Sequence, residues 1–273
     1  MTDIPGSKSE NRTMRNIKDK LYVATFCEKY REAMRDFGVG MEINHTCISH
    51  LLDEENGKRD KLLSNIQRDI DASEPSHVMI HGPFTEVIPA AIDHKFRELA
   101  MVRVNQAYDV ADHFGLKKMV VHTGWMPFMY FKSYQAEKGA EFWQEFMADK
   151  AKDFILAVEN VLDDEPYMIK EMADKITDPR IRICLDIGHA HAMTVKEYTV
   201  LDWIKVLGPH ITHFHLHNND GTGDSHSAFD EGTLDIKETL LAIEDYCPED
   251  VTYTIEARKA HDCLQWLGDK GFI

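Results

Sequence analysis

The 273-residue sequence lacks several features that would place it in a common class of proteins. No apolar run approaches the roughly 20 residues that span a bilayer, so we expect no membrane partner. The start of the chain is polar and has no apolar core of a secretory signal. Its five cysteines are scattered without a Cys-x-x-Cys pair, which argues against a disulfide scaffold or a thiolate zinc finger. These absences predict a cytoplasmic protein.

Positive charge is also scarce. Lys and Arg number 31 against 47 Asp and Glu, giving a net charge of −16. This balance repels phosphate backbones and anionic membranes at long range, although a metal-filled pocket can still be locally positive. Nucleic acid is therefore an unexpected partner that charge alone does not exclude.

The chain alternates short apolar runs with longer helix-like stretches, and no linker or repeat divides it. This alternation predicts a single α/β domain, a parallel (β/α)₈ TIM barrel over residues 17–273, preceded by a flexible tail over residues 1–16. The predicted strands are 21–25, 40–44, 77–81, 118–122, 154–159, 181–186, 211–217 and 251–256. The predicted helices are 28–37, 61–72, 97–114, 142–152, 167–176, 195–206 and 236–246.

Polar side chains stand where most of these strands end. Active sites of such barrels lie at the C-terminal ends of the strands, so these side chains should converge on one mouth. His and carboxylate sets without thiolates suit Zn²⁺, Mn²⁺ or Fe²⁺. A single member would more often be a helix cap or a loop group, but coincidence is a poor explanation for nine. The candidate metal ligands are His81, His122, Glu159, Asp186, His189, His215, Asp224, His226 and Glu256.

The seventh strand reads ITHFHLH and alternates in character. His213, His215 and His217 share one face, while Phe214 and Leu216 point to the other. His213 lies one step deeper than His215 and is predicted to be a core or supporting histidine. Asp220, in the following loop, is a further oxygen donor. The histidines given a structural role only are His45, His50, His77, His94, His113, His210 and His261.

Seven motifs together resemble the xylose isomerase-like TIM barrel superfamily, which includes endonuclease IV (AP endonuclease family 2) and the ketose 3-epimerases. The motifs are HGPF at His81, HTG at His122, VEN at Glu159, LDIGHAH at Asp186, HFHLHNND at His215, DSH at Asp224 and TIEAR at Glu256. The resemblance implies a shared metal set of Glu159, Asp186, His215 and Glu256. It also implies catalytic roles for Glu159 and Glu256 as acid and base, and for His189. The further match at His81, His122, His189, Asp224 and His226 implies a site of up to three zinc ions.

Two functions follow from this resemblance. The first is a divalent-metal-dependent isomerase or epimerase of a sugar, sugar phosphate or polyol, acting by metal-assisted proton transfer with one to three zinc or manganese ions. Its predicted substrate-binding residues are Arg258, His217 and Trp125. The alternative is a multinuclear zinc phosphodiesterase of the endonuclease IV type. The acidic composition and a short first βα connection, without a DNA-binding arm, weigh against DNA.

A third function, the aromatic stretch 125–134 and the segment at Asp230 remain to be considered. A non-catalytic sugar-binding barrel ranks last, because so many buried donors are costly without a metal or substrate. The aromatic stretch 125–134 fits a lid, a pocket wall, simple packing or a contact in a homo-oligomer. Asp230-Glu-Gly stands where the sugar enzymes have a Gly-x-Gly turn, a departure from their pattern.

Overall fold

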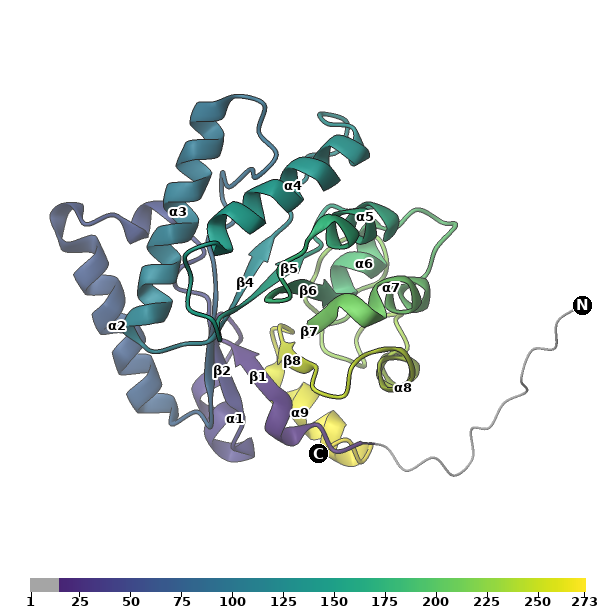
Figure 1. Cartoon of the computed structure of the whole chain (residues 1–273). Coiled ribbons are helices and arrows are strands. Elements are labelled where there is room, and N and C mark those ends of the chain that lie inside the picture. The colour runs from purple at the N-terminus through teal and green to yellow at the C-terminus, as the bar shows by residue number, and fades with distance from the viewer. Residues whose placement is uncertain (1–14) are drawn as a thin grey trace, which may run out of the picture.

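Eight parallel strands close into a barrel in a computed structural model that describes residues 15–273 (Figure 1). The strands pair in sequence order, and β1 pairs with β8 to close the ring. Each predicted strand is present, which confirms the (β/α)₈ fold. Most of the predicted tail, residues 1–14, lies outside the described residues. The strands are β1 (Leu21–Ala24), β2 (Gly40–Ile43), β3 (Val78–His81), β4 (Lys118–His122), β5 (Ile155–Glu159), β6 (Ile181–Asp186), β7 (Ile211–Leu216) and β8 (Thr252–Ile255).

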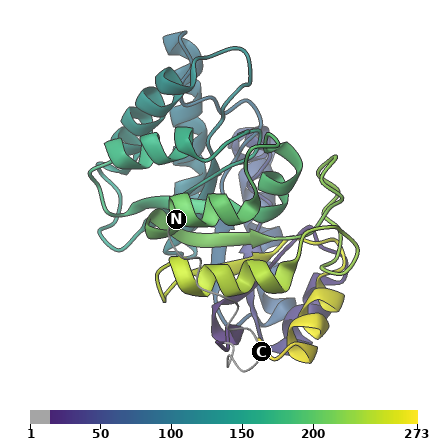
Figure 2. The same ribbon diagram turned by 90° about the vertical axis from the view of Figure 1, so that its right-hand side faces the viewer.

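Helices surround the barrel and separate successive strands (Figure 1). The α-helices are α1 (Tyr30–Phe37), α2 (Lys58–Ser73), α3 (His94–His113), α4 (Lys132–Met147), α5 (Tyr167–Lys175), α6 (Ile187–Met193), α7 (Val200–Leu207), α8 (Ile236–Tyr246) and α9 (Ala260–Asp269). Short 3₁₀ helices are η1 (Lys18–Lys20), η2 (Ser49–Leu52), η3 (Glu55–Gly57) and η4 (Gly208–His210). Figure 2 shows α8 running alongside the strands.

Four of these helices correct the sequence prediction. α7 begins at Val200 rather than at residue 195, because the side chain of Thr199 caps its first turn. α4 begins at Lys132 and ends at Met147, whereas residues 142–152 were predicted. Ala136 and Ala140, which precede its aromatic residues, are buried, so the helix extends further towards the N-terminus than the aromatic residues indicate. α6 and α9 were not predicted. α6 spans less than two full turns, too short for a helical period to stand out, and begins directly at the end of β6.

The alternation predicted for β7 is confirmed by the two apolar layers of the fold. Phe214 and Leu216 are fully buried in the large core between strands and helices. The interior of the barrel holds a much smaller apolar cluster of Met79, Val120, Ala157 and Cys184. Burying a large apolar side chain contributes about 1.5–3 kcal/mol, so the outer layer supplies most of the hydrophobic stability. The barrel interior is thereby left to polar side chains. Among residues 15–273, no helix combines the length and apolar character needed to cross a membrane.

Candidate metal centre

All nine predicted metal ligands meet at the C-terminal mouth of the barrel. Six are carried by strand ends or the residue just after a strand, and we call them the inner group: His81, His122, Glu159, Asp186, His215 and Glu256. The other three lie on α6 and in the β7–α8 connection. Together with His217, the residue after β7, they form the outer group: His189, His217, Asp224 and His226.

Glu159, at the end of β5, lies at the centre of the inner group and is 1% exposed. Its Oε2 atom is 3.1 Å from Nε2 of His81 and 3.4 Å from Nε2 of His122. Its Oε1 atom is 3.1 Å from Nδ1 of His215 and 3.3 Å from Nδ1 of His189. The two carboxylate oxygens thus face two separate sets of imidazoles. This is the geometry of a carboxylate that can bridge two cations.

His215 brings the remaining inner carboxylates together. Its Nδ1 atom is 3.8 Å from Oδ2 of Asp186 and 3.5 Å from Oε1 of Glu256. Asp186 is fully buried and Glu256 is 5% exposed. Glu256 follows β8 directly, and its backbone N–H donates to Leu216 on β7. Neighbouring parallel strands therefore place residues that are distant in sequence around one imidazole nitrogen.

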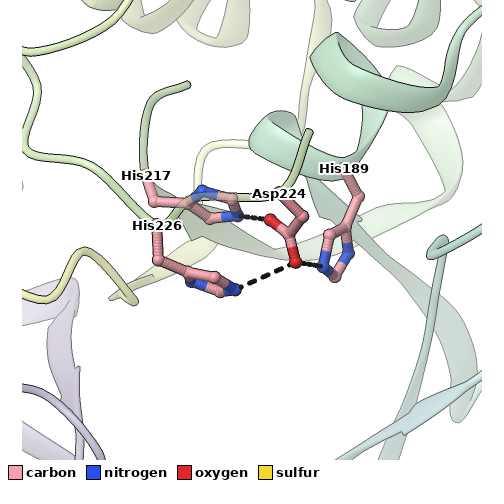
Figure 3. A group of neighbouring side chains, drawn as sticks. All are labelled: His189, His217, Asp224 and His226. Carbon is pink, nitrogen blue, oxygen red and sulfur yellow. Dashed lines mark ion pairs between the residues drawn. The ribbon is translucent and has the colours of Figure 1, made fainter. Parts of the chain in front are cut away.

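The outer group surrounds the carboxylate of Asp224 (Figure 3). Oδ2 of Asp224 is 3.3 Å from Nε2 of His189 and 3.2 Å from Nε2 of His226. Its Oδ1 atom is 3.7 Å from Nε2 of His217. The rings of His217 and His226 stack with centroids 4.0 Å apart. His226 has a φ of 49°, a left-handed conformation that non-glycine residues rarely adopt outside functional or turn positions.

Backbone carbonyls orient three of these imidazoles. The Nδ1 atom of His81 is 2.8 Å from the carbonyl oxygen of Gly82. Nδ1 of His189 is 2.9 Å from the carbonyl oxygen of Asn160, and Nδ1 of His226 is 2.9 Å from that of Glu256. Because a carbonyl only accepts, Nδ1 carries a proton in each case, and Nε2, which faces the carboxylates, is the nitrogen left to bind an ion. A metal-binding histidine commonly donates its other N–H in this way.

Unsatisfied atoms test whether a cation fits here. Both ring nitrogens of His215 and Nδ1 of His217 are buried without a hydrogen bond among the described residues. His215 lies close to four carboxylates, yet none of these contacts has hydrogen-bond geometry. Buried polar atoms are rarely left unpaired, and donors that point at a common ion are the natural exception. Several triads of the two groups have ligand atoms within 4.8 Å of one another. The donor set therefore fits a divalent metal.

Burial and mutual charge set the proton affinities at the mouth. Burial lowers the pKa of His122 to about 3, although Glu159 opposes the change. Burial also lowers the pKa of His226, but the Asp224 carboxylate outweighs it and the pKa rises to about 9. Burial raises the pKa of Glu256, and the neighbouring Glu159 carboxylate raises it further against the effect of His215. Without an ion, positive charge on the imidazoles and negative charge on the carboxylates stabilise one another.

A cavity of about 500 Å³ opens over the inner and outer groups. Apolar side chains of Phe26, Ile48 and Phe84 line it together with Asn44 and Cys47. Phe84 stacks on His122 with ring centroids 4.6 Å apart. Among the described residues that line this cavity there is no Lys or Arg. A ligand there meets donors at the floor and an apolar rim.

The three predicted substrate-binding residues lie in different places. Trp125 is 6% exposed and lines an adjoining cavity of about 240 Å³, which shares Phe84, His122 and Val161 with the larger one. His217 is fully buried and faces Asp186 and Asp224. Arg258 is exposed, and its backbone N–H donates to the carbonyl of His226. None of the three lines the larger cavity, and their roles stay predictions.

Sequence reasoning missed Glu42 and misplaced Asp220. Glu42, on β2, is fully buried, and its Oε1 is 3.3 Å from Nε2 of His215. A charged residue inside the short apolar run GMEIN was the available signal. Asp220 is exposed and accepts hydrogen bonds from Thr222 in its own turn, so it lies outside both groups. His213 is buried, as predicted, and lies beside Glu42; burial lowers its pKa to about 3.

A closed parallel barrel with imidazoles and carboxylates gathered at its C-terminal mouth defines a TIM-barrel protein with a candidate metal site. The chain belongs to the xylose isomerase-like TIM barrel family, whose family model matches residues 72–267. Members of this family are mostly enzymes, among them isomerases, epimerases and endonuclease IV.

One relative in sequence is the uncharacterised protein MJ1311 of Methanocaldococcus jannaschii. It is 25% identical over 199 residues, which cover 69% of this chain and 67% of the relative. A D-tagatose 3-epimerase-like protein has the same fold, with a TM-score of 0.71 at 21% identity over 92% of this chain and 98% of the other. Endonuclease IV from Thermus thermophilus has a TM-score of 0.59 at 17% identity over 92% and 99% of the two chains. These structural likenesses establish the fold.

Proposed function

We propose that the chain is an enzyme that uses a multinuclear divalent-metal centre to hydrolyse a phosphoester bond in a small substrate. The observation that carries this proposal is the placement of Glu159, whose Oε2 atom faces His81 and His122 and whose Oε1 atom faces Nδ1 of His215. A mononuclear centre would use the imidazoles at only one of these two oxygens. Of the two reactions predicted from sequence, the geometry therefore favours the second, with a small molecule in place of DNA.

The charge of the mouth supports more than one ion. Five carboxylates converge there, those of Glu42, Glu159, Asp186, Asp224 and Glu256, and no Lys or Arg of the described residues lines the cavity. A single divalent ion would leave about three negative charges uncompensated unless histidines were protonated. Burying an unpaired charge costs several kcal/mol, whereas three divalent ions would bring the site close to neutrality. Such a site can accept an anionic phosphoester without basic side chains.

The chain's residues have separate tasks in this reaction. His81, His122 and Glu159 would hold one ion; Asp186, His215 and Glu256 a second, sharing Glu159; and His189, Asp224 and His226 a third. Bound divalent ions supply Lewis acidity, which stabilises charge on phosphoryl oxygens and makes water more acidic. Phe26, Ile48 and Phe84 exclude bulk water from the rim. The Oδ1 atom of Asn44 accepts hydrogen bonds from Thr25, so its amide nitrogen is left to donate to a substrate oxygen.

Isomerisation or epimerisation of a sugar-like molecule is the second candidate. It is favoured by the size of the cavity, about 500 Å³, and by the presence of both Glu159 and Glu256 in its lining. Proton transfer requires at least one glutamate with an oxygen free to reach the substrate. Both oxygens of Glu159 face imidazoles, so Glu256 would have to provide that oxygen.

Metal counting and two sets of substrates distinguish the candidates. The purified chain is loaded with zinc or manganese, its ions are counted by elemental analysis, and turnover is followed with bis(p-nitrophenyl) phosphate, an abasic DNA duplex and a panel of ketoses. We expect two or three ions per chain and hydrolysis of the small phosphodiester without nicking of DNA. One ion per chain with turnover of a ketose would replace our proposal by the isomerase. Nicking of abasic DNA would extend the substrate beyond small molecules.

A further inference from the structure

His215 differs from three other imidazoles of the centre in the group that its second ring nitrogen faces. His81, His189 and His226 each have Nδ1 on a backbone carbonyl. His215 instead directs Nδ1 at the metal-binding carboxylates and Nε2 at the side chain of Glu42, 3.3 Å away. Among residues 15–273, neither Nε2 of His215 nor Oε1 of Glu42 has a hydrogen-bond partner. Each is thus available to the other.

A chain of hydrogen bonds below Glu42 has a fixed direction. The hydroxyl of Thr254 donates to Oε2 of Glu42, because a carboxylate only accepts. The same hydroxyl has no second proton, so Nε2 of His213, 2.9 Å away, donates to it. Nδ1 of His213 then accepts from the hydroxyl of Thr252 at 2.6 Å. Lys118, at the opposite end of the barrel, donates to Thr252 at 2.8 Å and starts the chain.

This direction leaves one role for the remaining oxygen of Glu42. Every donor in the chain points towards Glu42, which is fully buried and has no Lys or Arg of the described residues paired with it. A second donor must therefore approach Oε1 from the side of the mouth, and Nε2–H of His215 is placed to do so. The thiol of Cys184 also lies near His213 and His215, but sulfur is a weak acceptor compared with a carboxylate.

We propose that Glu42 is a positioning residue that holds the proton of His215 on Nε2, so that the Nδ1 lone pair is presented to a divalent ion. This inference rests on the metal centre of the proposed function. It gives Glu42 a task that does not involve the substrate. The carboxylate orients the ring and raises its basicity as a ligand, as carboxylate–histidine–metal arrangements do.

The test compares Glu42→Gln with a matched variant elsewhere in the fold. Asp69 is a carboxylate on α2 with a 5% exposed side chain, 2.9 Å from Nε2 of His45 and also paired with Arg31, so Asp69→Asn removes a buried charge from a His–carboxylate pair outside the inner and outer groups. Zinc affinity is measured by competition with a fluorescent chelator. We expect Glu42→Gln to weaken the tightest zinc site about 10- to 100-fold. Asp69→Asn should leave the zinc affinity within about threefold while costing thermal stability.

A second measurement needs no variant and reports the tautomer. Long-range ¹H–¹⁵N NMR spectra of histidine-labelled, zinc-loaded protein distinguish a protonated from a metal-bound ring nitrogen. We expect one zinc-bound imidazole with Nε2–H and metal on Nδ1, and the reverse assignment for the others. Equal zinc affinity of Glu42→Gln and wild type, or no imidazole bound through Nδ1, would overturn the role of Glu42 alone. A wild-type chain that binds no divalent ion would instead overturn the metal centre and the proposed function with it.

Discussion

The inner and outer groups differ in how the chain holds them. The inner donors stand on strand ends, and Glu159, Asp186 and His215 are at most 1% exposed. In the outer group, the side chains of Asp224 and His226 belong to a loop and are 31% and 20% exposed. Donors on strands are fixed by the closed barrel, whereas donors on a loop are fixed only as well as the loop is. We therefore expect the inner group to bind ions more tightly and the outer ion to exchange more readily.

Removing the bridge should abolish this distinction and have the largest effect. Glu159→Gln leaves the side-chain volume nearly unchanged but takes away the charge that faces both sets of imidazoles. We expect activity to fall at least about 100-fold, since loss of a ligand exceeds the usual cost of losing its support. Elemental analysis should find at least one ion fewer per chain. Retention of all ions would mean that Glu159 is not a bridge.

Neutralising Asp224 should affect the outer group alone. Asp224→Asn removes the carboxylate shared by His189 and His226, so we expect loss of one ion and a roughly 10- to 100-fold fall in activity. Asp220→Asn is the control, because Asp220 lies in the same loop, exposed and outside both groups. It should keep all ions and full activity. Equal effects of the two substitutions would indicate a general dependence on the loop.

Gly188 links the outer group to the fold. A Cβ atom at this position would lie 2.0 Å from the ring of His217, and the carbonyl of Gly188 accepts from the amide of Asn219. Because His217 is fully buried, its ring cannot swing into solvent. We expect Gly188→Ala to cost about 3 kcal/mol of the free energy of unfolding, measured with denaturant on metal-free protein. An unchanged midpoint would show that the His217 ring has room to move.

Asp163 should give the smallest and most local effect. Burial raises its pKa to about 6, against hydrogen bonds from Val161 and Thr123. The folded state then binds this proton more tightly than the unfolded chain, so the contribution of Asp163 to the free energy of unfolding should fall as pH rises from about 4 to about 6. The loss from this group is of the order of 2–3 kcal/mol. In metal-free Asp163→Asn this fall should be absent, and a pH profile identical to wild type would contradict the assignment.

The sequence was sufficient for the framework and for the strand-borne donors. Short apolar runs ending in a polar residue gave every strand to within two residues, because the face of each strand that packs against the helices is apolar. The period of two in β7 separated His215 from Phe214 and Leu216 correctly. Since equivalent strand ends meet at one mouth, convergence of Glu159, Asp186, His215 and Glu256 followed from the fold.

Other parts of the site depend on contacts that a single sequence does not reveal. Glu42 is significant only because β2 lies across the barrel from the face of β7 that carries His215. Asp220 and Asp224 look equivalent in the sequence, yet the local turn with Thr222 directs one to solvent, while His189 and His226 surround the other. His217 was predicted to bind substrate, and its burial against Gly188 becomes visible only in three dimensions.

Asp186 has two structural roles. Its Oδ1 atom accepts the backbone N–H of His189 at 2.7 Å, which starts α6, and the same carboxylate belongs to the inner group. The same two oxygens of Asp186 therefore cap α6 and face the metal centre. An ion arriving at the mouth would stiffen backbone as well as bind side chains, so part of its binding energy would be spent on local folding.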